Sequence, residues 1–314
     1  MASDTTSIST HQGVTQPHGR RIGWRRTGPY LYLAPALLYL TATLLYPIYS
    51  NLRMSLHDVN VSTFLAGEQS WVGLENYRAL FDDPAFWNAV RLSITFTAGS
   101  IVFQFTIGLA LALLFNSPFP GNNVLRSLML LGWLMPTILS GSVFRWMLDG
   151  DAGIINYVLT SLGVLDQKQY WLIDPGTALA GTIIANIWVG IPFNMLLLLA
   201  GLQSIPTTLY EAASLDGAGP WTQLRTITLP LLRPVALSIL LLGLIYTFKV
   251  FDLIYVMTGG GPVDVTTVMP IYTYQQTFEF FNFGIGASAA VVLMLAMLGI
   301  AMAYLWFSRH EEAQ

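Results

Sequence analysis

Apolar residues follow one another in this 314-residue chain in runs that are too long and too continuous for the core of a soluble domain. A helix of about twenty apolar residues is long enough to cross a lipid bilayer. Six such runs predict transmembrane helices, at about 30–52, 91–115, 125–148, 178–202, 235–258 and 284–307. The pattern therefore predicts an all-α integral membrane protein of six spans, with both termini on the same side.

The polar stretches divide the chain into three parts. Residues 1–27 are mostly polar and carry no apolar core, which predicts a disordered tail, and residues 309–314 form a second, short tail. Residues 28–308 make up the six-span domain. On the side of the two termini, the only sizeable connection between spans is 203–234.

The connection 203–234 carries the start and stop signals of a short helix. Thr208 and Glu211 have the T-x-x-E spacing of a capping box, which predicts a helix beginning near Thr208. Gly217 is placed to end it, since glycine readily adopts the left-handed conformation at a helix C-terminus.

Prolines shape the second half of the same connection. Pro220 suits the first position of a second helix, and Pro230 and Pro234 are expected to interrupt the backbone again before the fifth span. The sequence thus predicts a compact helix-turn-helix structure on the membrane surface.

Charge predicts which side this structure faces. Cytoplasmic flanks of membrane spans are enriched in Lys and Arg. The side of the termini has eight basic residues against five acids, and the other side has five basic residues against eleven acids. The termini and the 203–234 connection are therefore expected in the cytoplasm, and the protein in a bacterial cytoplasmic membrane.

The connection resembles the EAA loop of permease subunits in binding-protein-dependent ABC importers. The matching residues are Glu211, Ala212, Ala213, Asp216, Gly217, Ala218, Ile227, Leu229, Pro230 and Pro234, whereas Leu224 stands where the family often has Phe. Segments 72–97, 132–159, 248–262 and 272–295 are similar to the sugar-importing branch, which contains the maltose and glycerol-phosphate subunits. The resemblance covers about residues 28–308.

This resemblance implies a type I ABC importer permease fold and a set of partners. The partners are a second, similar permease, two ATPase subunits that hold ATP and Mg²⁺, an extracytoplasmic solute-binding protein or lipoprotein, and membrane lipid; nucleic acid is not expected. The loop would form the coupling helix in a groove of the ATPase. The residues assigned to that contact are Glu211, Ala212, Ala213, Asp216, Gly217, Ala218, Trp221 and Leu224.

Polar residues inside predicted spans are candidates for the substrate path, because their burial in lipid is costly. Lys249 and Asp252 lie three apart in the fifth span, on one face, with Tyr246 one turn earlier. They would line the path, or form an ion pair that fixes helix packing. Both alternatives stay open at this point.

The fourth span offers a second candidate surface. Asn186, Gly190 and Asn194 recur every four residues and share one helix face, with Trp188 nearby. Amides and aromatic rings commonly hold sugars, whereas the alternative is hydrogen bonding and close packing between helices. Gln104 in the second span is a weaker candidate for the path.

Other features exclude several classes of protein. The chain has no cysteine, its four histidines lie outside the spans, and neither lysine completes a P-loop, so we expect no catalytic, metal or cofactor site. The best interpretation is a non-catalytic subunit that moves a sugar or related polyol by alternating access. The alternatives are an ABC permease for a non-sugar solute and an ion-coupled secondary carrier, which normally has more intramembrane acids.

Overall fold

The computed structural model describes residues 24–311, and within that range the regular structure is helical. The expected disordered tail is wrong for its last residues, because a helix already begins at Trp24; residues 1–23 lie outside the described residues. The expected C-terminal tail is also shorter, since the last helix continues to Glu311, and only 312–314 lie outside the described part.

The chain divides into two units, up to Ser50 and from Asn51. The first unit contains α1 (Trp24–Leu40), the π-helical segment η1 (Thr41–Leu45) and the beginning of α2 (Tyr46–Ser55). Residues Tyr32–Ser55 are long and apolar enough to cross a membrane.

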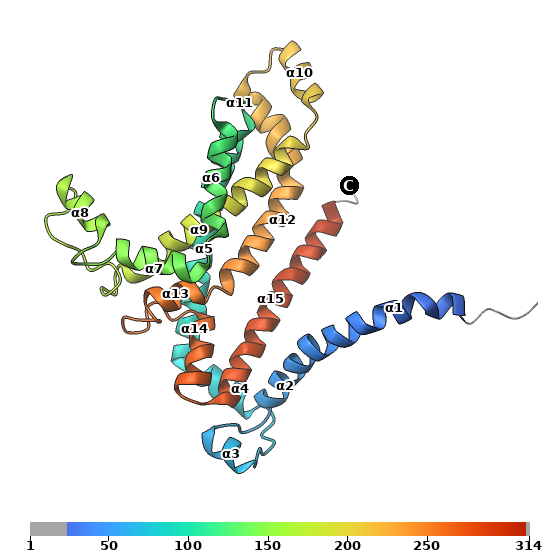
Figure 1. Ribbon diagram of the computed structural model, residues 1–314, viewed down its shortest axis with the longest axis vertical. Coiled ribbons are helices and arrows are strands. Elements are labelled where there is room, and N and C mark those ends of the chain that lie inside the picture. The colour runs from blue at the N-terminus through green and yellow to red at the C-terminus, as the bar shows by residue number, and fades with distance from the viewer. Residues whose placement is uncertain (1–23, 312–314) are drawn as a thin grey trace, which may run out of the picture. The chain divides into compact units, whose positions relative to one another are not determined.

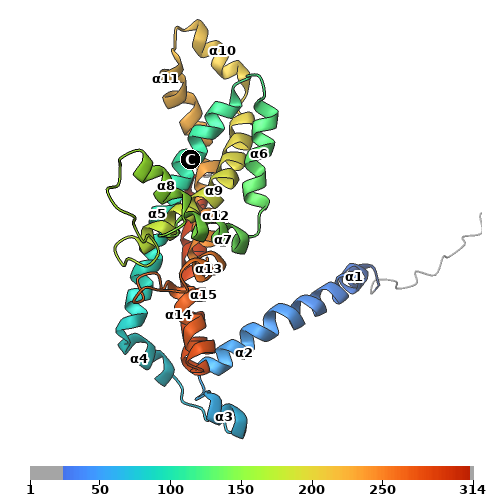
Figure 2. The same cartoon turned by 60° about the vertical axis from the view of Figure 1, so that its left-hand side comes forward.

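The second unit is a bundle of long helices with short helices at its two ends (Figure 1). Figure 2 shows that α10 and α11 lie at one end, with α3 and α4 at the other. The elements are α3 (Val61–Ala66), α4 (Glu75–Asp82), α5 (Pro84–Asn116), α6 (Asn122–Leu134), α7 (Thr137–Met147), α8 (Ile154–Ser161), α9 (Ala178–Gln203), α10 (Thr207–Leu215), α11 (Pro220–Gln223), the π-helical η2 (Leu224–Thr228), α12 (Leu229–Phe248), α13 (Asp252–Met257), α14 (Met269–Tyr274), the π-helical η3 (Gln275–Glu279) and α15 (Phe283–Glu311).

The predicted third span is not one straight helix. It consists of α6 and α7, which meet at an angle of 96°. Pro136 explains the break, since a proline pushes the residue before it out of the helical region, and Met135 is extended with ψ of 135°. With this bent pair counted as one span, the described chain has six candidate spans.

The predicted fifth span is wrong at both of its ends. It stops at Phe248, because Lys249, Val250 and Phe251 leave the helix before α13 begins at Asp252. At its other end, helical structure is continuous from Pro220 to Phe248, so Pro230 does not interrupt the backbone as expected.

A π-turn explains how the helix tolerates Pro230. The N–H of Leu229 bonds to the carbonyl of Leu224, five residues back, so the helix is widened immediately before the proline. This widening relieves the clash that a proline ring causes in a regular α-helix. The same arrangement precedes Pro47, where the N–H of Tyr46 bonds to Thr41.

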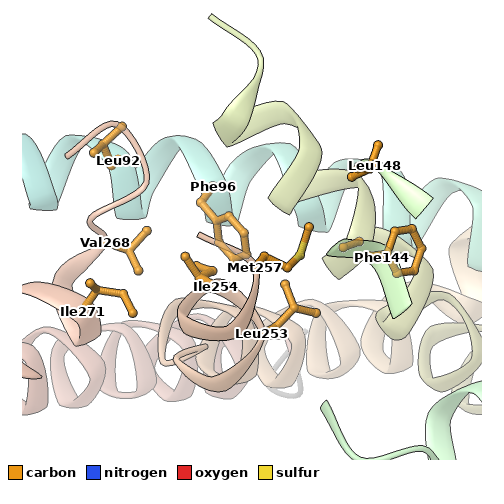
Figure 3. Close-up of a cluster of buried hydrophobic side chains, with 10 residues drawn as sticks. Leu92, Phe96, Phe144, Leu148, Leu253, Ile254, Met257, Val268 and Ile271 are labelled. Atoms are coloured by element: carbon orange, nitrogen blue, oxygen red, sulfur yellow. The ribbon is translucent and has the colours of Figure 1, made fainter. Parts of the chain in front are cut away.

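Three apolar clusters hold the second unit together. In one, α13 and α14 pack against α5, α7 and α9, with Phe96, Ile254 and Ile271 almost fully buried (Figure 3). A second cluster joins α5, α9 and α12, and a third joins α4, α5, α14 and α15. The helices α5 and α9 pack along each other. They approach closely at Gly108, where a Cβ would lie 2.7 Å from the Cβ of Asn194.

Candidate functional site

The loop at one end of the bundle has a fixed backbone. α10 ends in a left-handed Gly217 with φ of 81°. Its N–H bonds to the carbonyl of Ser214, and the N–H of Ala218 bonds to that of Ala213 at 2.9 Å, which together form a Schellman motif. Pro220 then opens α11. The structure therefore contains the helix-turn-helix that the sequence predicts.

Side chains tie the two halves of the loop to each other. The hydroxyls of Tyr210 in α10 and Thr228 in η2 lie 3.0 Å apart. The amide of Gln223 donates to Ser214 at 2.9 Å and to the carbonyl of Ala218 at 3.1 Å. Helical structure is continuous from α11 through η2 into α12, so the second half of the loop is a direct extension of the helix α12.

The predicted capping box is not present. α10 begins at Thr207 after an extended Pro206, and its N-cap makes no side-chain hydrogen bond. Thr208 therefore falls inside the first turn, where its hydroxyl cannot cap the helix. Glu211 is exposed on the second turn of α10.

The outer surface of the loop is apolar and exposed. Leu215 is 90 % exposed and Trp221 is 74 % exposed, while Leu224 is half-buried. Ala212 is exposed and Ala213 is half-buried. Exposed apolar side chains on a loop beyond the ends of the spans are candidates for a protein contact. The sequence interpretation missed Leu215, although a leucine directly before the polar turn Asp216-Gly217 was a signal for it.

A second site lies inside the bundle. It is found where the two broken helices, α6–α7 and α12–α13, meet α5 and α9. Here a cavity of about 260 Å³ opens between α5, α6, α7, α9 and α12. Its lining combines amides, aromatic rings and small residues, and none of its side chains is charged. The lining residues are Gln104, Trp133, Thr137, Asn186, Gly190, Phe193, Asn194, Gly243, Tyr246, Thr247 and Val250.

Three buried amides lie along one side of this cavity. Gln104 donates to the backbone carbonyl of Asn186 at 2.8 Å, and Asn194 donates to the carbonyl of Gly190 at 2.9 Å. The Nδ2 of Asn186 is buried and has no hydrogen-bond acceptor. An unused buried donor costs free energy, so a hydrogen-bond acceptor placed at this amide would be favourable.

Aromatic rings line the other side of the cavity. The rings of Trp133 and Phe193 are stacked at 5.9 Å, and the ring of Tyr246 stands edge-on to Phe193 at the same separation. The sequence prediction missed Phe193 and Trp133, because only the packing of α6 against α9 brings the two rings together. Amides opposite aromatic faces can hold a polar, neutral ring compound.

Three predicted path residues lie outside this cavity. Trp188 points to another side of α9, where its ring lies 5.7 Å from that of Phe144. The ammonium of Lys249 lies 4.9 Å from the centre of the Tyr246 ring, and Asp252 accepts a hydrogen bond from Thr137 at 3.2 Å. Lys249 and Asp252 do not pair with each other, because the helix breaks between them, so the ion-pair alternative is not realised in the structure.

A separate hollow of about 340 Å³ lies beyond α7 and α13, lined in part by Arg145, Asp149 and Tyr170. The backbone N–H groups of Ala152 and Asp151 bond to the carboxyl of Asp149 and hold its pKa below the usual value. Asp149 therefore keeps its negative charge beside Arg145 on this surface.

The sequence matches a known transport family. Residues 104–310 match the profile of the binding-protein-dependent transport system inner membrane component. This stretch contains the cavity, both helix breaks and the exposed loop. The chain belongs to this family. It is therefore a multi-pass inner membrane protein and the non-catalytic, transmembrane part of an ABC transporter.

Individual relatives cover nearly the whole chain. The trehalose/maltose transport system permease protein MalF of Thermococcus litoralis is 36 % identical over 90 % of this chain and 94 % of its own length. The sulfoquinovosyl glycerol transport system permease protein SmoG of Agrobacterium fabrum is 36 % identical over 90 % of each chain. The resemblance to sugar permeases is thereby confirmed.

Solved structures agree on the fold. A chain of a bacterial ABC transporter that imports the polysaccharide alginate has a TM-score of 0.79 at 24 % identity, covering 91 % of this chain and 97 % of that one. A chain of the MetNI methionine ABC transporter has a TM-score of 0.54 at 21 % identity, covering 73 % of this chain. The type I ABC importer permease fold predicted from the sequence is confirmed.

Proposed function

We propose that this permease passes a neutral sugar or related polyol across the cytoplasmic membrane through the amide- and aromatic-lined cavity. The observation that carries the proposal is the lining of the cavity, in which the buried amides Gln104, Asn186 and Asn194 occur with aromatic rings and with no charged side chain. The similarity to a trehalose/maltose permease supports a neutral sugar, and the similarity to a sulfoquinovosyl glycerol permease supports a sugar derivative in general.

The exposed loop between α9 and α12 is the proposed contact with an ATPase subunit. Leu215 and Trp221 would enter an apolar groove, with Glu211 at its rim and the small Ala212 and Ala213 allowing close approach. Asp216, Gly217 and Ala218 fix the turn, and half-buried Leu224 anchors it to the bundle. ATP and Mg²⁺ would be bound by the ATPase, so this chain would not need a nucleotide site of its own.

In this proposal, alternating access requires two similar permease subunits, of which this chain is one. A second, similar permease would close the other side of the cavity, and two ATPases would pull the two loops together. The helix α12 would then tilt with its loop as one body, because helical structure is unbroken from Pro220 to Phe248. The substrate would stay at the cavity while access changes sides.

The basic side of the chain, with the loop and both termini, is proposed to face the cytoplasm. The opposite, acidic side would receive a solute-binding protein. Arg145, Asp149 and Tyr170 belong to that side, and their mixed charges suit a partner with complementary rims.

Uptake by the reconstituted importer tests this proposal. The chain is purified with its second permease and ATPases, placed in proteoliposomes with its binding protein, and given radiolabelled trehalose, maltose and a polyol. We expect uptake of at least one of them only with ATP and binding protein. Uptake without any nucleotide-hydrolysing partner would contradict the proposal, as would uptake of amino acids alone.

One substitution separates docking from translocation. Ala212→Trp places a bulky side chain on the exposed loop surface and is expected to abolish ATPase stimulation. Thr222→Trp on α11, which is also exposed, is the control for added bulk. If Ala212→Trp supports normal uptake, the loop does not dock through this surface.

A further inference from the structure

The turn between α5 and α6 leaves the start of a helix uncapped. α6 begins at Asn122 after Gly121, whose φ is 82° and which has no side chain to cap the helix. The N–H of Asn122 bonds to Phe119, but those of Asn123 and Val124 have no acceptor in the described chain. Free N–H groups and the helix dipole make such an end attractive to an anion.

A positive side chain lies one turn further along the same helix. Arg126 is half-buried, and its Nη2 donates to the carbonyl of Phe115. Its Nε is buried without a partner, and no carboxylate of the described residues pairs with the guanidinium. The start of α6 and the guanidinium of Arg126 are both positive, and neither has a counter-charge in the described chain. An unpaired charge near the edge of a membrane is costly, so an anion here would be stabilising.

A buried amide in the same place also lacks a partner. Asn122 is only 9 % exposed, and its Nδ2 donates to the carbonyls of Phe115 and Ser117 at 3.0 and 2.7 Å. Its Oδ1 receives no hydrogen bond. A ligand that satisfies this turn therefore needs an anionic group for Arg126 and a donor for Asn122.

These residues line a cavity that continues onto the outer surface of α6. The cavity measures about 480 Å³ and includes Asn122, Asn123, Val124 and Arg126 in its lining. A shallow, open depression of about 380 Å³ on the surface of α6 alone, called the groove below, shares Asn123 and Val124 with it and runs past Leu128 and Leu131. Both leucines are more than half exposed. A polar pocket thus opens into an apolar groove along one helix.

We propose that this turn binds phosphatidylglycerol. The phosphodiester would accept hydrogen bonds from the N–H groups of Asn123 and Val124 and from Arg126. A hydroxyl of the glycerol headgroup would donate to Oδ1 of Asn122 after a small shift of that side chain. An acyl chain would lie in the groove beside Leu128. Anionic lipids are abundant on the cytoplasmic leaflet, where the positive charges of this chain predict that the turn lies.

The position of the turn gives the lipid a connection to the ATPase contact. The α5–α6 turn is at the same end of the bundle as α10 and α11 (Figures 1 and 2). Phe115 and Phe119 belong to the apolar cluster that also includes Tyr210 and Ile227 of the loop. A bound lipid would reduce the mobility of this apolar cluster, which packs against the loop. The proposal does not depend on the identity of the transported substrate.

Native mass spectrometry on the complete importer tests this site. The complex is delipidated in neutral detergent and titrated with phosphatidylglycerol, phosphatidylcholine or inorganic phosphate. For one site of the wild-type complex we expect at least tenfold tighter binding of phosphatidylglycerol than of phosphatidylcholine. Arg126→Gln should weaken phosphatidylglycerol at least tenfold, as expected for the loss of a charged hydrogen-bonding group.

Two further variants keep the test decisive if Arg126→Gln is unstable. Leu128→Trp fills the groove from an exposed position, so it should weaken phosphatidylglycerol and leave phosphate binding unchanged. Arg91→Gln, at the other end of α5 and bonded to Asn88, is the matched control and should bind lipid like the wild type.

Three outcomes would overturn the proposal. Equal binding by the wild type, Arg126→Gln and Leu128→Trp would show that the lipid lies elsewhere. Full competition by inorganic phosphate, with no effect of Leu128→Trp, would indicate a site for a free anion. Absence of any preferred lipid in the complete importer would indicate that a partner subunit covers this surface.

Discussion

Gly190 and Gln104 occupy adjoining parts of one small volume between α9 and α5. A Cβ added to Gly190 would lie 2.3 Å from Cδ of Gln104, well inside van der Waals contact. The absence of a side chain at Gly190 therefore lets the amide of Gln104 reach the carbonyl of Asn186. This contact holds together the amide side of the cavity.

Gly190→Ala should displace Gln104 and disturb the cavity. The added methyl must push the buried amide aside, which costs about 1–3 kcal/mol of the free energy of unfolding. We expect a lower melting temperature and weakened substrate uptake. Gly243→Ala is the control, because Gly243 lines the same cavity and its Cβ would meet no atom within 4 Å. Equal behaviour of the two variants would contradict the close packing described here.

Gly217→Val should uncouple the ATPase without preventing membrane insertion. Gly217 has φ of 81°, which a β-branched residue adopts only with strain of about 1–3 kcal/mol. The loop should then lose its turn, and both uptake and substrate-stimulated ATP hydrolysis should fall. Gly219→Val is matched to it, since Gly219 has φ of −73° and open space around its Cβ. Normal ATPase coupling in Gly217→Val would refute the role of the turn.

Asn186→Leu separates a substrate contact from a packing role. Because the Nδ2 of Asn186 has no protein partner, its removal should leave the melting temperature unchanged or raise it slightly. Loss of a hydrogen bond to substrate should raise the KM for uptake about three- to tenfold. A fall in stability with an unchanged KM would show that this amide serves packing alone.

Lys249→Met should have little effect on substrate affinity. Lys249 is exposed, lies outside the cavity and contacts the Tyr246 ring, and such an exposed cation–π contact contributes about 0.5–1 kcal/mol. We expect the KM for uptake to change less than threefold. Tyr246→Ala, which removes a ring from the cavity wall, should raise the KM more. A larger effect at Lys249 than at Tyr246 would place the charge in the path.

Local signals in the sequence were sufficient for the exposed loop. Gly217 and Pro220 act on the backbone of their own neighbours, so their effect does not depend on distant contacts. The predicted capping box was wrong for an equally local reason: Pro206 is the N-cap and α10 begins at Thr207, one residue before Thr208. The exposure of Leu215 could not be predicted in this way. It depends on which other elements lie near α10, and the sequence of one helix does not contain that information.

The break at Lys249–Phe251 shows where local reasoning stops. No proline or glycine stands there, and the only charged residues in the run 235–258 are Lys249 and Asp252, which a helix can accommodate. α13 instead leaves the line of α12 to pack against α7, where a Cβ on Gly141 would lie 3.1 Å from the carbonyl oxygen of Leu253. That contact joins residues more than a hundred positions apart.

The sequence by itself determined the class of the protein, the number of spans and the place of the loop, because these depend on runs of apolar residues and on short backbone signals. Only the tertiary structure decided which polar side chains share a cavity. Asn186 and Asn194 enter it with Gln104, Trp133 and Tyr246, whereas Trp188 and Lys249 do not. The physical reason is that a cavity is formed by the angles at which helices pack and break, and these angles depend on contacts between distant residues.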